Sequence, residues 1–317
     1  MKKVLLASTA LMMVAGAAAA EVTISGSGRA GLVYTDDNNP ATQDTTVSYR
    51  LRFNVDASKE TDSGVKLGGR IRFQDGGGSG EASFSAAYVY AESGGFRVEV
   101  GNANTAYDSA ALMYNSEIGY LDRSFGDPQG TFFSFSSGGY TGTPDRVGVY
   151  VSYSAGDLNV QASAVDPDQT ASSTATTETE VGVSASYKFG AFTVAAAAAM
   201  DGGGIAGNDN YYVGGEYAVN DATNVGLQYF DNGDTNGAAP GDVGQQVTLY
   251  GNTKLAGGVV LGAYIANNDQ LGNIPGGQDT SYGIGAGYDI GGATVAGAIH
   301  QGYDGNTTAD LGIKFSF

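Results

Sequence analysis

Six basic side chains near the start of the chain recur at alternate positions of three short segments. They are Arg29, Arg50, Arg52, Lys66, Arg70 and Arg72. Successive side chains of a β-strand point to opposite faces, so these cations share the face opposite the aliphatic residues. Such crowded like charges repel one another unless anions or water lie nearby. The pattern therefore predicts a wet, basic wall.

One long segment between two expected strands supplies the carboxylates. Residues 102–145 exceed by far the connections of about 4–6 residues that compact domains prefer, and such long loops are usually functional. The acidic side chains of this segment are Asp108, Glu117, Asp122, Asp127 and Asp145, and Arg123 is its one basic residue. An inward fold of this loop would set acids across from the basic wall and create a charged constriction that admits hydrated solutes. The alternative is that the arginines only neutralise neighbouring acids and stiffen the wall.

Alternation with a period of two residues continues along the rest of the chain. Segment 45–56, for example, places Val47, Leu51 and Val55 opposite Arg50 and Arg52. We expect sixteen strands, at 22–34, 45–56, 64–74, 82–91, 95–101, 146–155, 157–166, 178–188, 191–200, 210–219, 224–231, 243–254, 258–267, 280–289, 292–302 and 308–317. Short and long connections alternate between them, as in outer-membrane barrels, and an even strand count puts both termini on the short-turn side.

The apolar residues do not form a membrane-spanning helix. After residue 20 no run approaches the roughly 20 apolar residues that such a helix needs. Only helices and closed barrels satisfy all backbone polar groups in lipid, and an arginine facing lipid near the midplane costs about 2–4 kcal/mol. The prediction is an all-β fold, a 16-stranded antiparallel transmembrane β-barrel with its basic face toward a water-filled lumen. The alternative is a soluble all-β sandwich or propeller, whose strands also alternate.

Composition agrees with an exported, hollow protein. Lys2 and Lys3, the apolar stretch 4–16 and the small residues 18–20 predict a cleaved signal peptide at 1–20, followed by one barrel domain at 21–317. The chain has no cysteine, so a large closed sheet must replace the disulfides of many secreted domains. Its net charge of −18 argues against binding of nucleic acid.

Enzymatic motifs are absent from the sequence. The single histidine, His300, lies on the expected strand 292–302, where it faces the lumen away from any serine cluster. Neither a GxSxG motif, nor a paired-cysteine metal motif, nor a phosphate-binding loop occurs. We therefore expect no enzyme. An outer-membrane barrel with a hydrolase or adhesin role remains an alternative.

Several segments resemble the general-diffusion porins of Rhodobacter-type alphaproteobacteria. These are AYDSAALMYNSEIGY at 106–120, SFGD at 124–127, VDPDQT at 165–170, VTLYGN at 247–252 and YGIGA at 282–286. The resemblance runs from residue 21 to residue 317. It implies an outer-membrane homotrimer of 16-stranded barrels for passive diffusion of ions and small hydrophilic solutes, in contact with lipid and lipopolysaccharide. A solute-specific porin is the alternative within this class.

The resemblance also implies roles for particular residues. Asp108, Glu117 and Asp127 would be on the acidic side of the constriction, facing Arg29, Arg50, Arg52, Arg70 and Arg72 on the wall. The loop composition adds Asp122 to the acidic side, and the alternation adds Lys66 to the basic side. No cofactor is implied as required, but family members hold calcium among loop carboxylates, and Asp108, Glu117 and Asp127 are candidates. The terminal Phe317 resembles the signal read by the outer-membrane assembly machinery.

Three small residues lie on the outward face of the first expected strand. Gly26, Gly28 and Ala30 occupy positions where lipid would tolerate bulk. Close packing against another subunit would explain them, and so would ordinary irregularity of the strand.

Overall fold

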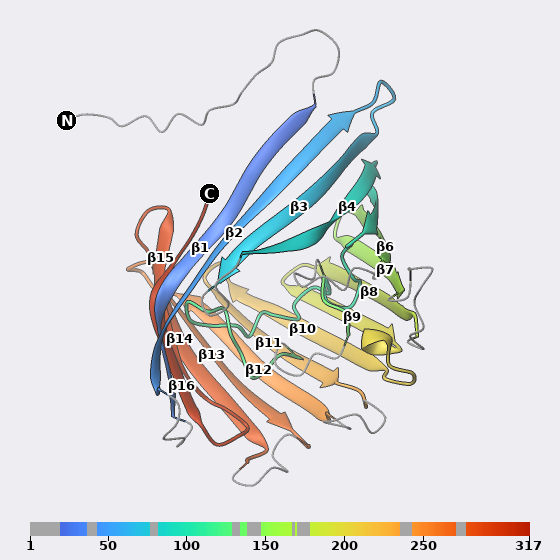
Figure 1. Ribbon diagram of the computed structural model, residues 1–317. Coiled ribbons are helices and arrows are strands. Elements are labelled where there is room, and N and C mark those ends of the chain that lie inside the picture. Colours follow the sequence, from blue (N-terminus) through green and yellow to red (C-terminus); the bar gives the residue numbers. More distant parts are fainter. Residues whose placement is uncertain are drawn as a thin grey trace, which may run out of the picture.

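The chain forms one antiparallel sheet that closes on itself (Figure 1). Each strand pairs with its neighbours in sequence, and β1 pairs with β16 to close the barrel. The computed structural model describes residues 20–36, 43–76, 82–128, 134–137, 147–166, 169, 178–234, 243–270 and 277–317. The expected signal peptide lies almost wholly outside these residues, as does Asp145. No helix in these ranges is long and apolar enough to cross a membrane.

All sixteen predicted strands are present, which confirms the predicted fold. They are β1 Glu21–Asp36, β2 Thr45–Glu60, β3 Lys66–Gly76, β4 Ser83–Ser93, β5 Phe96–Gly101, β6 Val147–Ala155, β7 Leu158–Asp166, β8 Glu180–Phe189, β9 Phe192–Met200, β10 Asn210–Asn220, β11 Thr223–Asp231, β12 Gln245–Lys254, β13 Val259–Asn268, β14 Thr280–Asp289, β15 Ala293–Gln301 and β16 Thr307–Ser316. A short 3₁₀ turn, η2, occupies Gly202–Gly204.

The largest difference from the expected bounds is at the end of β2. The apolar alternation ends near residue 56, but the strand continues to Glu60 because its backbone still pairs with β3 as far as Lys66. A hydrogen bond from the Thr61 amide to the Val65 carbonyl, 2.8 Å long, then closes the turn. Backbone pairing therefore extends beyond the side-chain pattern that predicted the strand.

The strands alternate between an outward apolar face and an inward polar or small face. On β12, for example, Val247 and Leu249 are exposed on the outside, whereas Thr248 and Tyr250 are buried on the inside. The outer face of a barrel that contacts lipid should show this arrangement, with aromatic girdles at both interfaces. One girdle is visible at the short-turn end, where rings of neighbouring strands pack in sequence: Tyr187, Phe189, Phe192 and Tyr217, with centroid separations of 6.1, 5.6 and 4.6 Å.

Tight turns at the short-turn end depend on glycine. The connection between β4 and β5 consists of Gly94 and Gly95, with φ angles of 57° and 83°. Two successive residues with positive φ are the signature of a type I′ hairpin turn, in which the twist of the turn matches that of the strands. Glycine adopts these angles without the steric cost that a Cβ atom brings.

The small residues at the start of β1 make room for rings of the last strand. A Cβ atom at Gly26 would come within 2.6 Å of the Phe317 ring, and one at Gly28 would collide with the ring of Phe315. The Phe317 ring also packs edge-on against Phe53 of β2, with centroids 5.3 Å apart. Packing within the chain therefore accounts for Gly26 and Gly28, and the C-terminal rings strengthen the seam at which the barrel closes.

The long loop leaves the wall at an irregularity in β4. Arg70 pairs with Tyr88 and Arg72 with Ser85, so β4 carries one extra residue between these pairs. The side chain of Asn102 donates hydrogen bonds to the Ser85 hydroxyl at 2.9 Å and to the Ala86 carbonyl at 3.1 Å. Because a bulge bends its strand and re-aims the chain, this contact fixes the direction in which the loop starts.

The outward orientation of the aliphatic residues can be tested at Leu227, in the middle of β11. Leu227→Arg should lower the stability of the folded protein in lipid vesicles by about 2–4 kcal/mol, because a guanidinium would face the hydrocarbon. Urea unfolding followed by tyrosine fluorescence measures this difference. Leu227→Phe is the control and should leave stability nearly unchanged; equal stability of the arginine variant would show that residue 227 does not face lipid.

Candidate functional site

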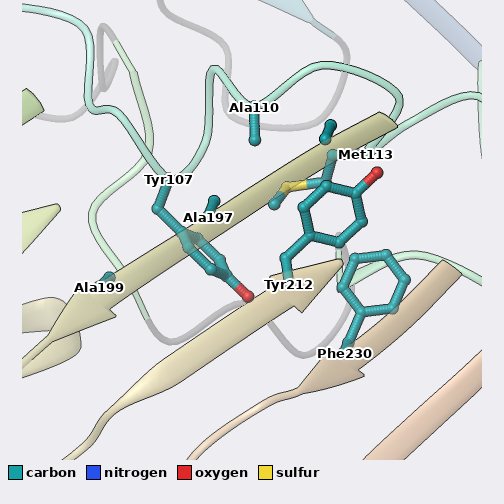
Figure 2. Packing of buried hydrophobic residues seen from close by; sticks show 8 residues of the cluster. Tyr107, Ala110, Met113, Ala197, Ala199, Tyr212 and Phe230 are labelled. Atoms are coloured by element: carbon teal, nitrogen blue, oxygen red, sulfur yellow. The ribbon is translucent and has the colours of Figure 1, made fainter. Parts of the chain in front are cut away.

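The first part of the long loop packs inside the barrel against β9, β10 and β11 (Figure 1). Figure 2 shows Met113 of the loop beside the Tyr212 ring of the wall, which stacks on Phe230, and Tyr107 of the loop beside Ala197. Beside them, the buried inward residues of β9 are all alanines, at positions 195, 197 and 199. These small side chains leave space for the loop, so the wall and the loop together form the main apolar cluster.

Hydrogen bonds fix the same part of the loop to the wall. The Tyr212 hydroxyl donates to the Ala111 carbonyl at 3.1 Å, and the Gln228 side-chain amide donates to the Met113 carbonyl at 3.0 Å. The loop is also tied to itself, because Asp108 accepts hydrogen bonds from the Tyr114 hydroxyl and from the Ser137 amide. The first part of the loop is therefore held to the wall both by apolar contacts and by hydrogen bonds.

The next stretch folds into a small hairpin, residues 118–123, which we call the loop hairpin. The Ile118 amide donates to the Arg123 carbonyl at 3.0 Å, and the reverse bond is 3.1 Å long. Ile118 lies against glycines of β13 and β14: a Cβ atom at Gly262 would be 2.7 Å from its Cγ2 atom, and one at Gly285 would be 3.0 Å from its Cβ atom. The wall therefore has glycines, without side chains, at the positions that Ile118 of the hairpin approaches.

The fully buried Tyr120 fills a slot between β1 and β16. A Cβ atom at Gly31 or at Gly312 would come within 2.8 Å of its ring. The Tyr120 amide donates a 2.8 Å hydrogen bond to the Asp310 carboxylate on β16. This contact brings the loop hairpin to the seam of the barrel.

Three cations lie side by side on the wall at this seam, and two of them contact the loop hairpin. Arg29 of β1 pairs directly with Lys314 of β16 on one side and with Arg50 of β2 on the other, so the three lie at one level on adjacent strands. We call Lys314, Arg29 and Arg50 the cationic row. Directly opposed like charges destabilise a sheet unless they are compensated.

The loop hairpin supplies that compensation. Lys314 donates to the Asp122 carboxylate and, at 3.1 Å, to the Gly119 carbonyl. Arg29 donates to the Leu121 carbonyl. Asp122 adopts a positive φ of 50°, a conformation that is uncommon for residues other than glycine, at the point where it turns toward Lys314. The attraction between Lys314 and Asp122 therefore acts on a residue that lies in the tight turn of the loop hairpin.

The other predicted wall residues divide into two groups. Arg52, Arg70 and Arg72 lie on β2 and β3 and bond across to the neighbouring strand, with Nε atoms 2.9 Å from Gln74, 2.7 Å from Asp56 and 2.6 Å from Asn54, respectively. Lys66 is the first residue of β3, exposed and paired in register with Glu60 and Glu92. The structure therefore separates Lys66 from the five arginines and places it at the rim of the short-turn end.

The predicted acids also divide. Asp122 contacts the cationic row, and Glu117 lies close to it. Asp127 is only 3% exposed and lies near Glu117, whereas Asp108 is held by Tyr114 and Ser137. Burial, together with Asp127 and Asp122, raises the pKa of Glu117 from 4.5 to about 9, although Lys314 and Arg29 act in the opposite direction. Glu117 therefore carries a proton at neutral pH.

Two hollows flank the loop hairpin. One of about 440 Å³ lies between Glu117, Asp122 and the small-residue wall of β12 to β15, which includes Gly262 and Gly285. The other, about 450 Å³, is lined by all of the cationic row together with Asp122 and Asp289. Charges of both signs therefore line open space on either side of the narrowed section.

The candidate calcium ligands do not fit a metal site. Among the described residues, no group of three or more histidine, cysteine, aspartate or glutamate side chains could hold a metal ion. Asp108 is engaged by Tyr114 and Ser137, and Glu117 keeps its proton at neutral pH. We derive no role for calcium at Asp108, Glu117 and Asp127.

Sequence reasoning missed two charged residues of the site. Alternation along the last strand places Lys314 on its inner face, but the pairing of Lys314 with Arg29 arises only when the barrel closes. Glu216 of β10 accepts hydrogen bonds from Asn115 of the loop at 2.9 Å and from Tyr250 at 2.8 Å. Its inward position at the end of an alternating strand was the one available signal.

A family model described as Gram-negative porin matches residues 7–315 of the chain. The chain belongs to this family. Membership identifies the barrel as an outer-membrane channel rather than an enzyme, which confirms the resemblance seen in the sequence.

Individual relatives agree with this assignment. The chain is 41% identical over 302 residues to a porin from Fuscovulum blasticum and 29% identical over 331 residues to a porin from Rhodobacter capsulatus; each match covers 94% of this chain and 100% of the relative. Its fold matches solved variants of the Rhodopseudomonas blastica porin. One, with a lysine and an arginine replaced by alanine, has a TM-score of 0.84, and another, with an aspartate and a glutamate replaced, has 0.85. Both are 37% identical and cover 94% of this chain and 100% of theirs.

The fit of Ile118 against the glycine wall can be tested at Gly262. Gly262→Val should destabilise the folded porin by about 1–3 kcal/mol, because added methyl groups overpack a close contact. Urea unfolding measures the loss. Ile118→Ala combined with Gly262→Val should recover most of it, and a double variant no more stable than Gly262→Val would contradict the contact.

The raised pKa of Glu117 predicts a pH dependence of ion selectivity. As pH rises through about 9, ionisation of Glu117 adds a negative charge to the narrowed section, so the cation-to-anion permeability ratio should rise. The free energy of unfolding also falls as pH rises from about 4.5 to about 9, because over this range the unfolded chain loses the proton that Glu117 keeps in the folded porin. Reversal potentials between pH 7 and 10 measure the ratio. Glu117→Gln should abolish the step that is centred near pH 9, and a step that persists in this variant would assign it to another group.

Proposed function

We propose that this porin passes ions and small hydrophilic solutes by passive diffusion through a charged constriction. In this proposal the basic side is the cationic row with Arg52, Arg70 and Arg72 beside it, and the acidic side is Asp122 and, once ionised, Glu117. The observation that carries the proposal is the contact of Lys314 and Arg29 with the loop hairpin inside the lumen. Selectivity in such a pore follows from its diameter and from the charges that line it.

The effective charge of this constriction is basic at neutral pH. Lys314 is neutralised by Asp122, and Glu117 is protonated, so Arg29 and Arg50 remain as the excess charge of the row. The total charge of the chain, −18, has the opposite sign. We therefore propose that the acidic residues elsewhere concentrate cations at the mouths, while the narrow section itself favours anions.

We also propose that the protein is a homotrimer whose contact face includes β1 to β4. The outward side of this region carries Phe53, Phe73 and Phe84, whose rings pack at 5.0 and 6.0 Å, next to the exposed Val22 and Ile24. β1 begins five residues before Gly26, and Gly26 is the residue that forms backbone hydrogen bonds with Phe317. Figure 1 accordingly shows β1 to β3 projecting past the C-terminus. An apolar face outside the lipid is stabilised by a second copy of the chain.

Neutralising Arg50 tests the charged constriction without loosening the loop hairpin. Arg50→Gln should raise the cation-to-anion permeability ratio about fivefold at low salt, since one unit charge at close range is worth about 1 kcal/mol in water. The effect should shrink in 1 M salt. Reversal potentials across planar bilayers under a salt gradient measure the ratio.

Lys66→Gln is the matched control, because Lys66 lies at the exposed rim. Its ratio should equal that of the unmodified porin. An unchanged ratio in Arg50→Gln would overturn the assignment of Arg50 to the narrowest section. A saturable block of the current by one class of solute would favour a solute-specific porin over general diffusion.

A further inference from the structure

The only histidine of the chain is buried beneath the loop. His300 points inward from β15 and is 2% exposed. Alternation along the sequence predicts that this side chain faces the lumen. Its inward direction is as expected, but both ring nitrogens face groups that hold the loop rather than open water.

One ring nitrogen of His300 is linked, through Tyr264, to the residues that follow the loop hairpin. His300 Nδ1 lies 3.0 Å from the Tyr264 hydroxyl on β13. That hydroxyl accepts a 3.0 Å hydrogen bond from the amide of Phe125, two residues after the hairpin. The Phe125 ring also packs edge-on against the imidazole, with centroids 6.0 Å apart.

The other ring nitrogen is linked, through Asp310, to the loop hairpin itself. His300 Nε2 lies 3.8 Å from Oδ2 of Asp310 on β16. The second oxygen of that carboxylate, Oδ1, accepts the 2.8 Å hydrogen bond from the Tyr120 amide. Tyr264 and Asp310 are themselves 4% and 8% exposed, so water hardly competes for these contacts.

The hydrogen positions follow from the donors and acceptors. The Tyr264 oxygen already accepts from Phe125, so its own hydrogen is free to be donated to Nδ1. A neutral imidazole then carries its proton on Nε2, which lies 3.8 Å from the Asp310 carboxylate, an electrostatic contact longer than a hydrogen bond. The result is one continuous chain of polar contacts from the Phe125 amide to the Tyr120 amide.

We propose that His300 is a positioning residue that couples these two attachments of the loop, so that the loop hairpin moves as one piece. Two separate attachments would let either end of the hairpin detach alone, and each detachment would change the width of the pore. A shared imidazole links the two events, because loss of one contact removes the orienting partner of the other. Coupling of this kind is testable without reference to ion flow, although its effect on the current rests on the proposed constriction.

Amide hydrogen exchange of the intact porin in detergent, resolved at Tyr120 and Phe125, tests the coupling. His300→Leu should speed exchange at both amides by about 3- to 10-fold, the usual effect of losing one buried hydrogen bond. Tyr264→Phe should speed exchange at Phe125 directly and at Tyr120 through His300. In a chain that already carries His300→Leu, Tyr264→Phe should no longer affect Tyr120.

Two further variants separate coupling from a general loss of packing. His300→Asn keeps an acceptor near the position of Nδ1 but cannot reach Asp310, so Phe125 should stay protected while Tyr120 exchanges faster. Thr308→Val changes a buried residue that pairs directly with His300 and whose hydroxyl forms no hydrogen bond to the described residues, so it should leave both amides unchanged. Equal exchange at Tyr120 in Tyr264→Phe and in the unmodified porin would overturn the proposal. So would a Thr308→Val variant that behaves like His300→Leu.

Discussion

Closure of the sheet is the constraint on which the rest of the molecule depends. In lipid no water is available for unpaired backbone groups, so every strand needs a neighbour on both sides. The last such pairing, β1 with β16, joins the two ends of the chain and is supported by the rings of Phe315 and Phe317 over Gly28 and Gly26. The same pairing brings Lys314 beside Arg29, so the act of closing the barrel also assembles the cationic row.

The interior is organised by small residues instead of an aliphatic core. Alanines on β9 and glycines on β13 and β14 leave the inner wall flat, and the long loop lies directly against it. Tyrosines fill the remaining space, and their hydroxyls bond to loop carbonyls and amides. The loop therefore acts both as the packing partner of half of the wall and as the element that narrows the channel.

Charge and packing act together at the seam. The cationic row would be unfavourable by itself, and the loop hairpin would bury unpaired backbone groups without it. Contact between Lys314, Arg29 and the hairpin resolves both problems at once. A cation that is paired with the hairpin attracts passing anions less strongly than an unpaired one. The same contact therefore also determines how much of the positive charge on the wall contributes to ion selectivity.

Local alternation and spacing along the chain predict the fold class, the number of strands, their inward and outward faces and the long loop. They also indicate that the arginines face water. Only the tertiary structure decided which charges meet: Lys66 moves to the rim and Lys314 joins the row, Asp108 is held by Tyr114 and Ser137, while Asp127 is buried near Glu117. The reason is physical. Alternation fixes the face on which a side chain lies, whereas its level in the pore depends on strand register, barrel closure and the path of the loop, which connect residues as far apart as Arg29 and Lys314.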